Sequence, residues 1–150
     1  MFIACAAAIA PLIVSASPAS AACAGDPNAL SIRQMIITGT TGSDRFDVLF
    51  LGRVVRLHDL DGEAGGPTLA RFRVKAHPVG FAPQGARVRF WKPPPNVSVS
   101  ENLEFKLGHR YAVVAHRRSN GVFWSDGACG QTTQLSQHRM RRLIRLYHHT

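Results

Sequence analysis

The sequence predicts an all-β domain, a small barrel or sandwich of five or six short antiparallel strands followed by a C-terminal helix. Segments rich in β-branched and aromatic residues recur between residues 46 and 124, and turns containing Gly, Pro or Asn separate them. In several of these segments, apolar and basic residues alternate with a period of two. The chain has 150 residues, a length that suits one hydrophobic core.

The first segment has the pattern of a secretory signal, predicted over residues 1–21, and residues 22–150 form the single mature domain. An uncharged apolar run is followed by Ala19-Ser20-Ala21, which matches the A-x-A cleavage pattern. Cleavage after Ala22 is an alternative. An uncleaved anchor is another, although the apolar run stops near Val14, short of the roughly 20 residues of a spanning helix. We therefore expect a secreted or periplasmic protein that has no integral membrane span after cleavage.

The first element of the domain is ambiguous, and the second is the strongest predicted strand. Residues 29–37 are apolar in a pattern that fits either a helix or a strand, and residues 38–44 have the composition of a loop. Residues 46–57 are rich in β-formers, with Gly52 in the middle, a position typical of a bulge or sharp bend. Residues 59–67 are acidic and Gly-rich, which predicts a hairpin loop.

Two strands with clear alternation follow, at residues 68–77 and 86–91. Their predicted inward residues are apolar: Phe72, Val74, Ala76, Val88 and Phe90. Their predicted outward residues are basic: Arg71, Arg73, Lys75, Arg87 and Arg89. If these strands pair, the basic residues form one face, which either binds anions or is a solvated surface that blocks edge pairing. We see no aromatic residue at the outward positions of these strands, so the face lacks the stacking platform typical of nucleic-acid binding.

The remaining elements are shorter strands and a helix. Candidate strands lie at residues 96–100, 111–115 and 122–124. From Gln131 the periodicity changes, and the apolar residues Met140, Leu143, Ile144 and Tyr147 fall on one face of an amphipathic helix. We expect a basic C-terminal helix and tail over residues 136–150 that packs this stripe on the barrel. Binding of its arginines to an anionic membrane is the alternative.

Cysteine usage and net charge restrict the functions that the sequence allows. Removal of the signal removes Cys5 and leaves Cys23 and Cys129, for which an oxidising compartment predicts a disulfide. The mature domain carries the whole net charge of +9, which predicts attraction to polyanionic sugars, lipid headgroups or nucleic acid. Export makes nucleic acid a poor physiological partner. We expect no catalytic residue, cofactor or metal site, because no zincin, phosphate-loop or nucleophile-elbow motif occurs.

Three segments carry a family resemblance. Residues 46–54 form an apolar opening strand, residues 105–113 contain the pattern F-x-x-G-x-x-Y, and Cys129 precedes the final helix. In this order the segments resemble bacterial relatives of the tissue inhibitors of metalloproteinases, which share an OB-type barrel with netrin modules. The resemblance implies that the mature chain is a small OB-like closed barrel of five to six antiparallel strands with a C-terminal helix.

The resemblance also implies a mechanism. In that family the α-amino nitrogen and carbonyl oxygen of an N-terminal Cys chelate the catalytic zinc of a protease, which has an open coordination position. Only Cys23 matches this role here, and only if the signal is cleaved after Ala22; Gly25 stands where the family has a second Cys. The implied function is an exported, non-catalytic protein that docks on or inhibits an extracellular metalloprotease. The alternative is a basic module that binds anionic envelope polymers or lipid surfaces.

Overall fold

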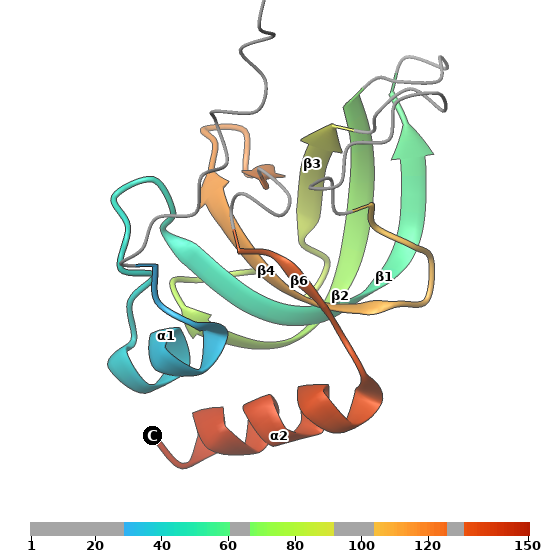
Figure 1. Ribbon diagram of the computed structural model, residues 1–150. Coiled ribbons are helices and arrows are strands. Elements are labelled where there is room, and N and C mark those ends of the chain that lie inside the picture. Colours follow the sequence, from blue (N-terminus) through green and yellow to red (C-terminus); the bar gives the residue numbers. More distant parts are fainter. Residues whose placement is uncertain (1–28, 61–66, 92–103, 126–130) are drawn as a thin grey trace, which may run out of the picture.

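The computed structural model describes residues 29–60, 67–91, 104–125 and 131–150 (Figure 1). Its elements are, in chain order, α1 (Ile32–Thr38), β1 (Val48–Asp59), β2 (Pro67–Val79), β3 (Arg87–Trp91), β4 (Arg110–Arg117), β5 (Phe123–Trp124), β6 (Thr133–Leu135) and α2 (Gln137–His148). The predicted strands at 46–57, 68–77, 86–91, 111–115 and 122–124 are therefore confirmed. The predicted signal, the predicted strand at 96–100, Cys23 and Cys129 lie outside the described residues.

The strands close into an OB-like barrel, as predicted. Their order is β1-β2-β3-β5-β4, β4 also pairs with β1, and β6 adds a sixth strand beside β4. One feature of the prediction is wrong: β3 and β5 are parallel, through Val88 opposite Phe123 and Arg89 opposite Trp124. The reason is geometric, because strand directions alternate at every antiparallel step and a closed ring with an odd number of strands cannot alternate throughout. The barrel is therefore mixed.

The barrel interior is filled by aromatic rings. Phe105 packs edge-on against Phe72, Phe90 and Tyr111, with ring centroids 5.1, 4.7 and 4.9 Å apart. Phe72 packs in the same way on Phe50 at 5.4 Å. Edge-to-face contacts at these distances are the geometry that the ring quadrupoles favour. The inward positions predicted for β2 and β3 supply two of these rings, so the alternation in those strands correctly identified interior residues.

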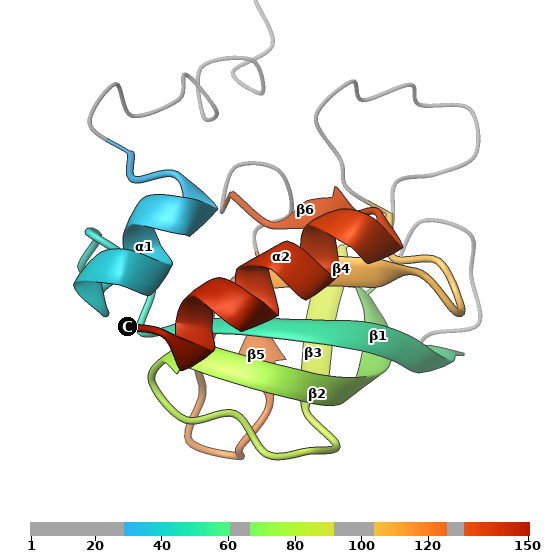
Figure 2. The ribbon, with the colours of Figure 1, turned by 90° about the horizontal axis from the view of Figure 1, so that it is seen from below.

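A second core lies outside the barrel, where α1 and α2 cover β1, β2 and β4 (Figure 2). On α2, Met140 and Leu143 are buried, and Ile144 and Tyr147 pack partly buried against the same cluster. The predicted apolar stripe of the C-terminal helix therefore packs on the barrel. This cover also explains the uninterrupted apolar run in β1, because both faces of residues 48–51 are buried. Within the described residues, no helix has the length and apolar character needed to cross a membrane.

Two local features were left open or missed by the sequence reading. Residues 32–38 are helical, and a capping box starts this helix: the Ser31 side chain accepts from the Gln34 amide, and the Gln34 side chain accepts from the Ser31 amide. The strand β6 occupies residues 133–135, in the stretch where the helical periodicity was predicted to begin. It is only three residues long, too short for a period of two to be visible.

Ala76 was predicted to face inward with Phe72 and Val74, and this is wrong. In the β1–β2 pair, Gly52 lies opposite Val74 and Leu51 lies opposite Ala76, so β2 contains one extra residue at Lys75. This bulge moves Ala76 to the outer face of the barrel, where it belongs to the core beneath the helices. The bulge lies beside Gly52, where the sequence predicted an irregularity.

Candidate anion-binding face

The basic residues predicted to share one face all lie on the outer surface of β2 and β3, but the structure divides them into three groups. Arg71 and Arg87 are directly opposite each other in the β2–β3 pair. Arg73 and Lys75 lie nearer to α2 and line a groove beside it. Arg89 packs on an aromatic ring. The prediction is therefore confirmed for outward orientation, while a single continuous patch of five residues is not formed.

The first group is a row of three arginines across three neighbouring strands. Arg56 of β1 lies opposite Arg71 of β2, and Arg71 lies opposite Arg87 of β3. Arg56 reaches this face because β1 has a register shift between Val54 and Arg56, which leaves Val55 as an extra residue. Neighbouring strands are about 4.8 Å apart, so the three side chains start within about 10 Å of one another.

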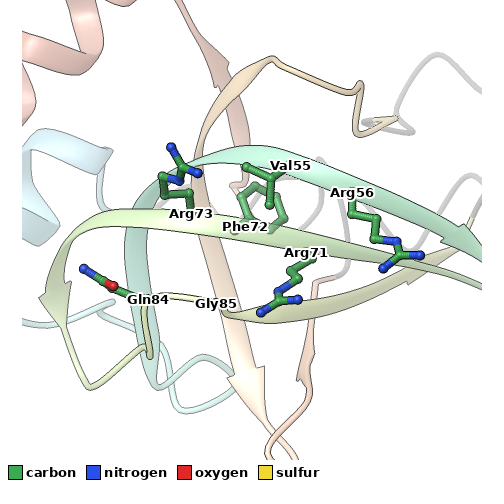
Figure 3. Close-up of a pocket in the computed structure, with 7 residues that line it drawn as sticks. All are labelled: Val55, Arg56, Arg71, Phe72, Arg73, Gln84 and Gly85. Atoms are coloured by element: carbon green, nitrogen blue, oxygen red, sulfur yellow. The ribbon is translucent and has the colours of Figure 1, made fainter.

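A pocket of about 360 Å³ adjoins this row (Figure 3). It is lined by Val55, Arg56, Arg71, Phe72, Arg73, Gln84 and Gly85. Figure 3 shows the Arg71 side chain extending toward Gly85, while Arg73 extends toward β1. A Cβ atom added to Gly85 would lie 3.2 Å from an Nη atom of Arg71, so the missing side chain leaves room for the guanidinium group.

The electrostatics of the row favour anions. None of the described residues that line the pocket is acidic, whereas three of them are arginines. Like charges directly opposite each other in a sheet are destabilising. An anion placed between these groups removes part of that repulsion and accepts charge-assisted hydrogen bonds from the guanidinium groups. The arrangement can therefore bind an anion.

Arg89 has a different environment. Its guanidinium carbon lies 5.4 Å from the centroid of the Trp124 ring, and that of Arg118 lies 5.6 Å from the same ring. These are cation–π distances. The Nε atom of Arg89 is buried and has no hydrogen-bond partner in the described part of the chain. Arg89 is thus held against Trp124 rather than presented freely with Arg71 and Arg87.

Sequence reasoning missed residues on both sides of the predicted face. Arg53 and Arg56 of β1 lie beside β2, and Arg110 of β4 lies beside Arg53; only the barrel register brings them together. Trp91 is 59% exposed at the end of β3 and has the same parity as Arg87 and Arg89. The expectation that no aromatic residue lies at an outward position is therefore wrong for Trp91, and period-2 counting over residues 87–91 was sufficient to find it.

The other predicted site, the zinc-chelating Cys23 and its disulfide with Cys129, lies outside the described residues. In the part of the chain that the structure describes, no group of three or more His, Cys, Asp or Glu side chains is placed to hold a metal ion. A comparison with protein-family models finds no match to this chain, and a comparison with curated proteins finds none either.

Proposed function

We propose that this domain is a non-catalytic module that binds an anionic polymer across the outer face of β1, β2 and β3. The observation that carries the proposal is the row Arg56–Arg71–Arg87, in which each arginine is the direct cross-strand neighbour of the next. Three guanidinium groups spread over about 10 Å match a ligand whose negative charges repeat along a chain better than a single small ion.

The chemistry of the neighbouring surface supports a polysaccharide as the polymer. Trp91 is exposed on the same strand as Arg87, and an exposed indole offers an apolar face for a sugar ring. The faces of β2 and β3 in OB barrels bind oligosaccharides or oligonucleotides. Together with the predicted export, this favours an anionic polymer of the cell envelope over nucleic acid.

The test compares two triple variants that remove the same charge. We expect Arg56→Gln/Arg71→Gln/Arg87→Gln to weaken binding to heparin, used as a model sulfated polysaccharide, by about tenfold, since three exposed ionic contacts contribute about 0.5 kcal/mol each. Isothermal titration calorimetry at two ionic strengths measures the affinity. For the unmodified domain, the affinity should fall as ionic strength rises.

The matched control is Arg139→Gln/Arg142→Gln/Arg145→Gln on the exposed side of α2. None of these three residues lines the pocket beside the row. If both triple variants lose affinity equally, binding follows net charge alone and the proposed face is wrong. If neither loses affinity, the polymer binds elsewhere and the proposal fails as well.

A further inference from the structure

A second cationic site lies between α2 and the barrel, next to the pocket of the first arginine row, and Arg73 lines both. A groove of about 280 Å³ runs along α2 where the helix crosses β1, β2 and β4. Basic residues dominate its polar lining: Arg53, Arg73, Lys75, Arg110 and Arg141. Gln137, Met140 and Ile144 of α2 complete it, and none of the described residues that line it is acidic.

The floor of the groove is a second row of three arginines. Arg53 of β1 lies between its two strand neighbours, opposite Arg110 of β4 on one side and Arg73 of β2 on the other. Directly opposite residues share one face of a sheet, so the three guanidinium groups leave the barrel on the same side. Arg110 is only partly exposed, which reduces its solvation and strengthens its interaction with an anion.

Two further cations reach the groove from its edges. Lys75 is the extra residue of the β2 bulge and lies two positions beyond Arg73. Both residues line the groove. Arg141 comes from the opposite wall, on α2. The groove therefore presents positive charge from three strands and one helix, and an anion with several acceptor oxygens can be reached from all of these directions.

The helical wall is apolar as well as basic. Met140 is 5% exposed, and Ile144 packs partly buried against the outer core. Both line the same groove as the arginines. A ligand that occupies the groove therefore meets guanidinium groups of the strands and a thioether and an aliphatic side chain of the helix.

We propose that this groove binds an amphiphile whose headgroup is a phosphate monoester. Its phosphate lies on the row Arg110–Arg53–Arg73, because planar guanidinium groups match phosphate oxygens with paired hydrogen bonds. The start of its apolar chain lies on Met140 and Ile144. A phosphate ester without an apolar chain contacts only the arginines. The amphiphile also contacts Met140 and Ile144, so it binds more tightly.

The experiment uses the whole domain and three soluble probes below their micellar concentrations. Dihexanoyl phosphatidic acid is the amphiphile, glycerol 3-phosphate is its headgroup alone, and dihexanoyl phosphatidylcholine has a similar tail with a zwitterionic head. We expect the phosphatidic acid to bind at least about tenfold more tightly than glycerol 3-phosphate, since burying two methylene groups contributes this much. We expect the phosphatidylcholine to bind at least about tenfold more weakly than the phosphatidic acid.

Variants place the binding in the groove. Arg53→Gln/Arg110→Gln should weaken phosphatidic acid binding at least about tenfold, because two of the three phosphate ligands are lost. Arg139→Gln/Arg142→Gln removes the same charge from residues outside the groove lining and should leave the affinity within about twofold. Equal loss in both variants, or equal binding of glycerol 3-phosphate and the amphiphile, overturns the proposal, as does an absence of phosphatidic acid binding.

Failure of the amphiphile proposal can be distinguished from failure of the polymer-binding proposal. Arg53 and Arg110 line only the groove, and Arg56 lines only the pocket of the first row, although Arg73 lines both. Heparin affinity in Arg53→Gln/Arg110→Gln should therefore equal that in Arg139→Gln/Arg142→Gln. A larger loss of heparin affinity in the groove variant would mean that the two rows form one polymer site, and it would contradict a separate amphiphile site.

Discussion

The side chain of Tyr111 shows how one residue of the F-x-x-G-x-x-Y pattern serves the fold. Its ring packs on Phe105, and its hydroxyl group accepts a hydrogen bond from the Lys106 amide at 2.9 Å and donates one to the Glu104 carbonyl at 3.2 Å. The tyrosine thus ties the segment before β4 to the strand itself. Burial raises the pKa of Tyr111 above its ordinary value of 10.0, and the Lys106 hydrogen bond opposes this only in part.

Replacement of Tyr111 by Phe should lower the free energy of unfolding at neutral pH by about 1–2 kcal/mol, because the Lys106 amide loses its acceptor. The raised pKa means that the folded state holds the phenolic proton more tightly than the unfolded state does. The contribution of Tyr111 to stability is therefore complete below pH 10.0 and is lost as pH rises above it through the folded pKa. The difference between the two proteins should shrink over this alkaline range.

Urea unfolding followed by circular dichroism, at neutral pH and at several alkaline values, measures both effects. Tyr147→Phe is the matched control, since the Tyr147 hydroxyl makes no hydrogen bond within the described residues and its loss should cost little at neutral pH. A constant difference between Tyr111→Phe and the unmodified protein across the alkaline range would show that Tyr111 does not titrate as described.

At the scale of single residues, the sequence correctly predicted which side chains face inward or outward in most positions, but it did not predict which residues lie next to one another on neighbouring strands. Alternation in β2 and β3 correctly separated Phe72 and Phe90 from Arg71 and Arg87. It could not predict that Arg56 lies opposite Arg71 or that Arg53 lies between Arg73 and Arg110, because these neighbours depend on bulges and on pairing with distant strands. Ala76 was misplaced for the same reason, since one extra residue in a strand reverses every later position.

At the scale of the elements, Gly80 constrains the turn between β2 and β3. Gly80 has a φ of +63°, and a side chain there would collide with the carbonyl oxygen of Asp47. This residue therefore fixes the end of β2 against the start of β1, near the outer core.

Gly80→Ala should lower the free energy of unfolding by at least about 3 kcal/mol, through both the left-handed backbone and the collision. Gly121 has a similar φ of +72° but open space at its Cβ position, so Gly121→Ala should cost only about 1 kcal/mol. Thermal and chemical unfolding of the two variants measure these costs. Equal costs for both would mean that the contact with Asp47 contributes nothing.

Helices and strands could be predicted where the pattern of apolar and polar residues within the element itself was long enough to recognise. The strands β1 to β4 and the C-terminal helix have patterns that extend over five or more residues, and all were found. The helix α1 was ambiguous by periodicity, although its Ser31-x-x-Gln34 capping box was present in the sequence. The strands β5 and β6 consist of two and three residues, so their partners rather than their own patterns define them.

At the scale of the whole molecule, the mature form of the chain is the main prediction that the described residues do not address. We expect the exported protein to lack residues 1–21. We also expect a disulfide between Cys23 and Cys129, so the oxidised protein should be lighter than the reduced protein by two hydrogen atoms. N-terminal sequencing and intact mass of exported protein, before and after reduction, measure both. A mature chain that begins at Cys23 would retain the zinc-chelating inhibitor mechanism, whereas one that begins at Ala22 would abolish it. An uncleaved chain that retains Cys5 would contradict the predicted signal.

The pairing of β1 with both β2 and β4 has a consequence for folding kinetics. The strands β1, β2 and β3 pair with their sequence neighbours, whereas closure of the barrel pairs Arg53 with Arg110, which lies 57 positions further along the chain. Closing a long loop costs more entropy than closing a hairpin, and non-local strand pairing slows folding. The row Arg56–Arg71–Arg87 is thus complete once the local meander has formed, while the row Arg110–Arg53–Arg73 exists only after the barrel has closed. The two proposed sites therefore differ in what they require of the fold: the first row needs only the three-stranded meander, and the groove beside α2 needs the closed barrel.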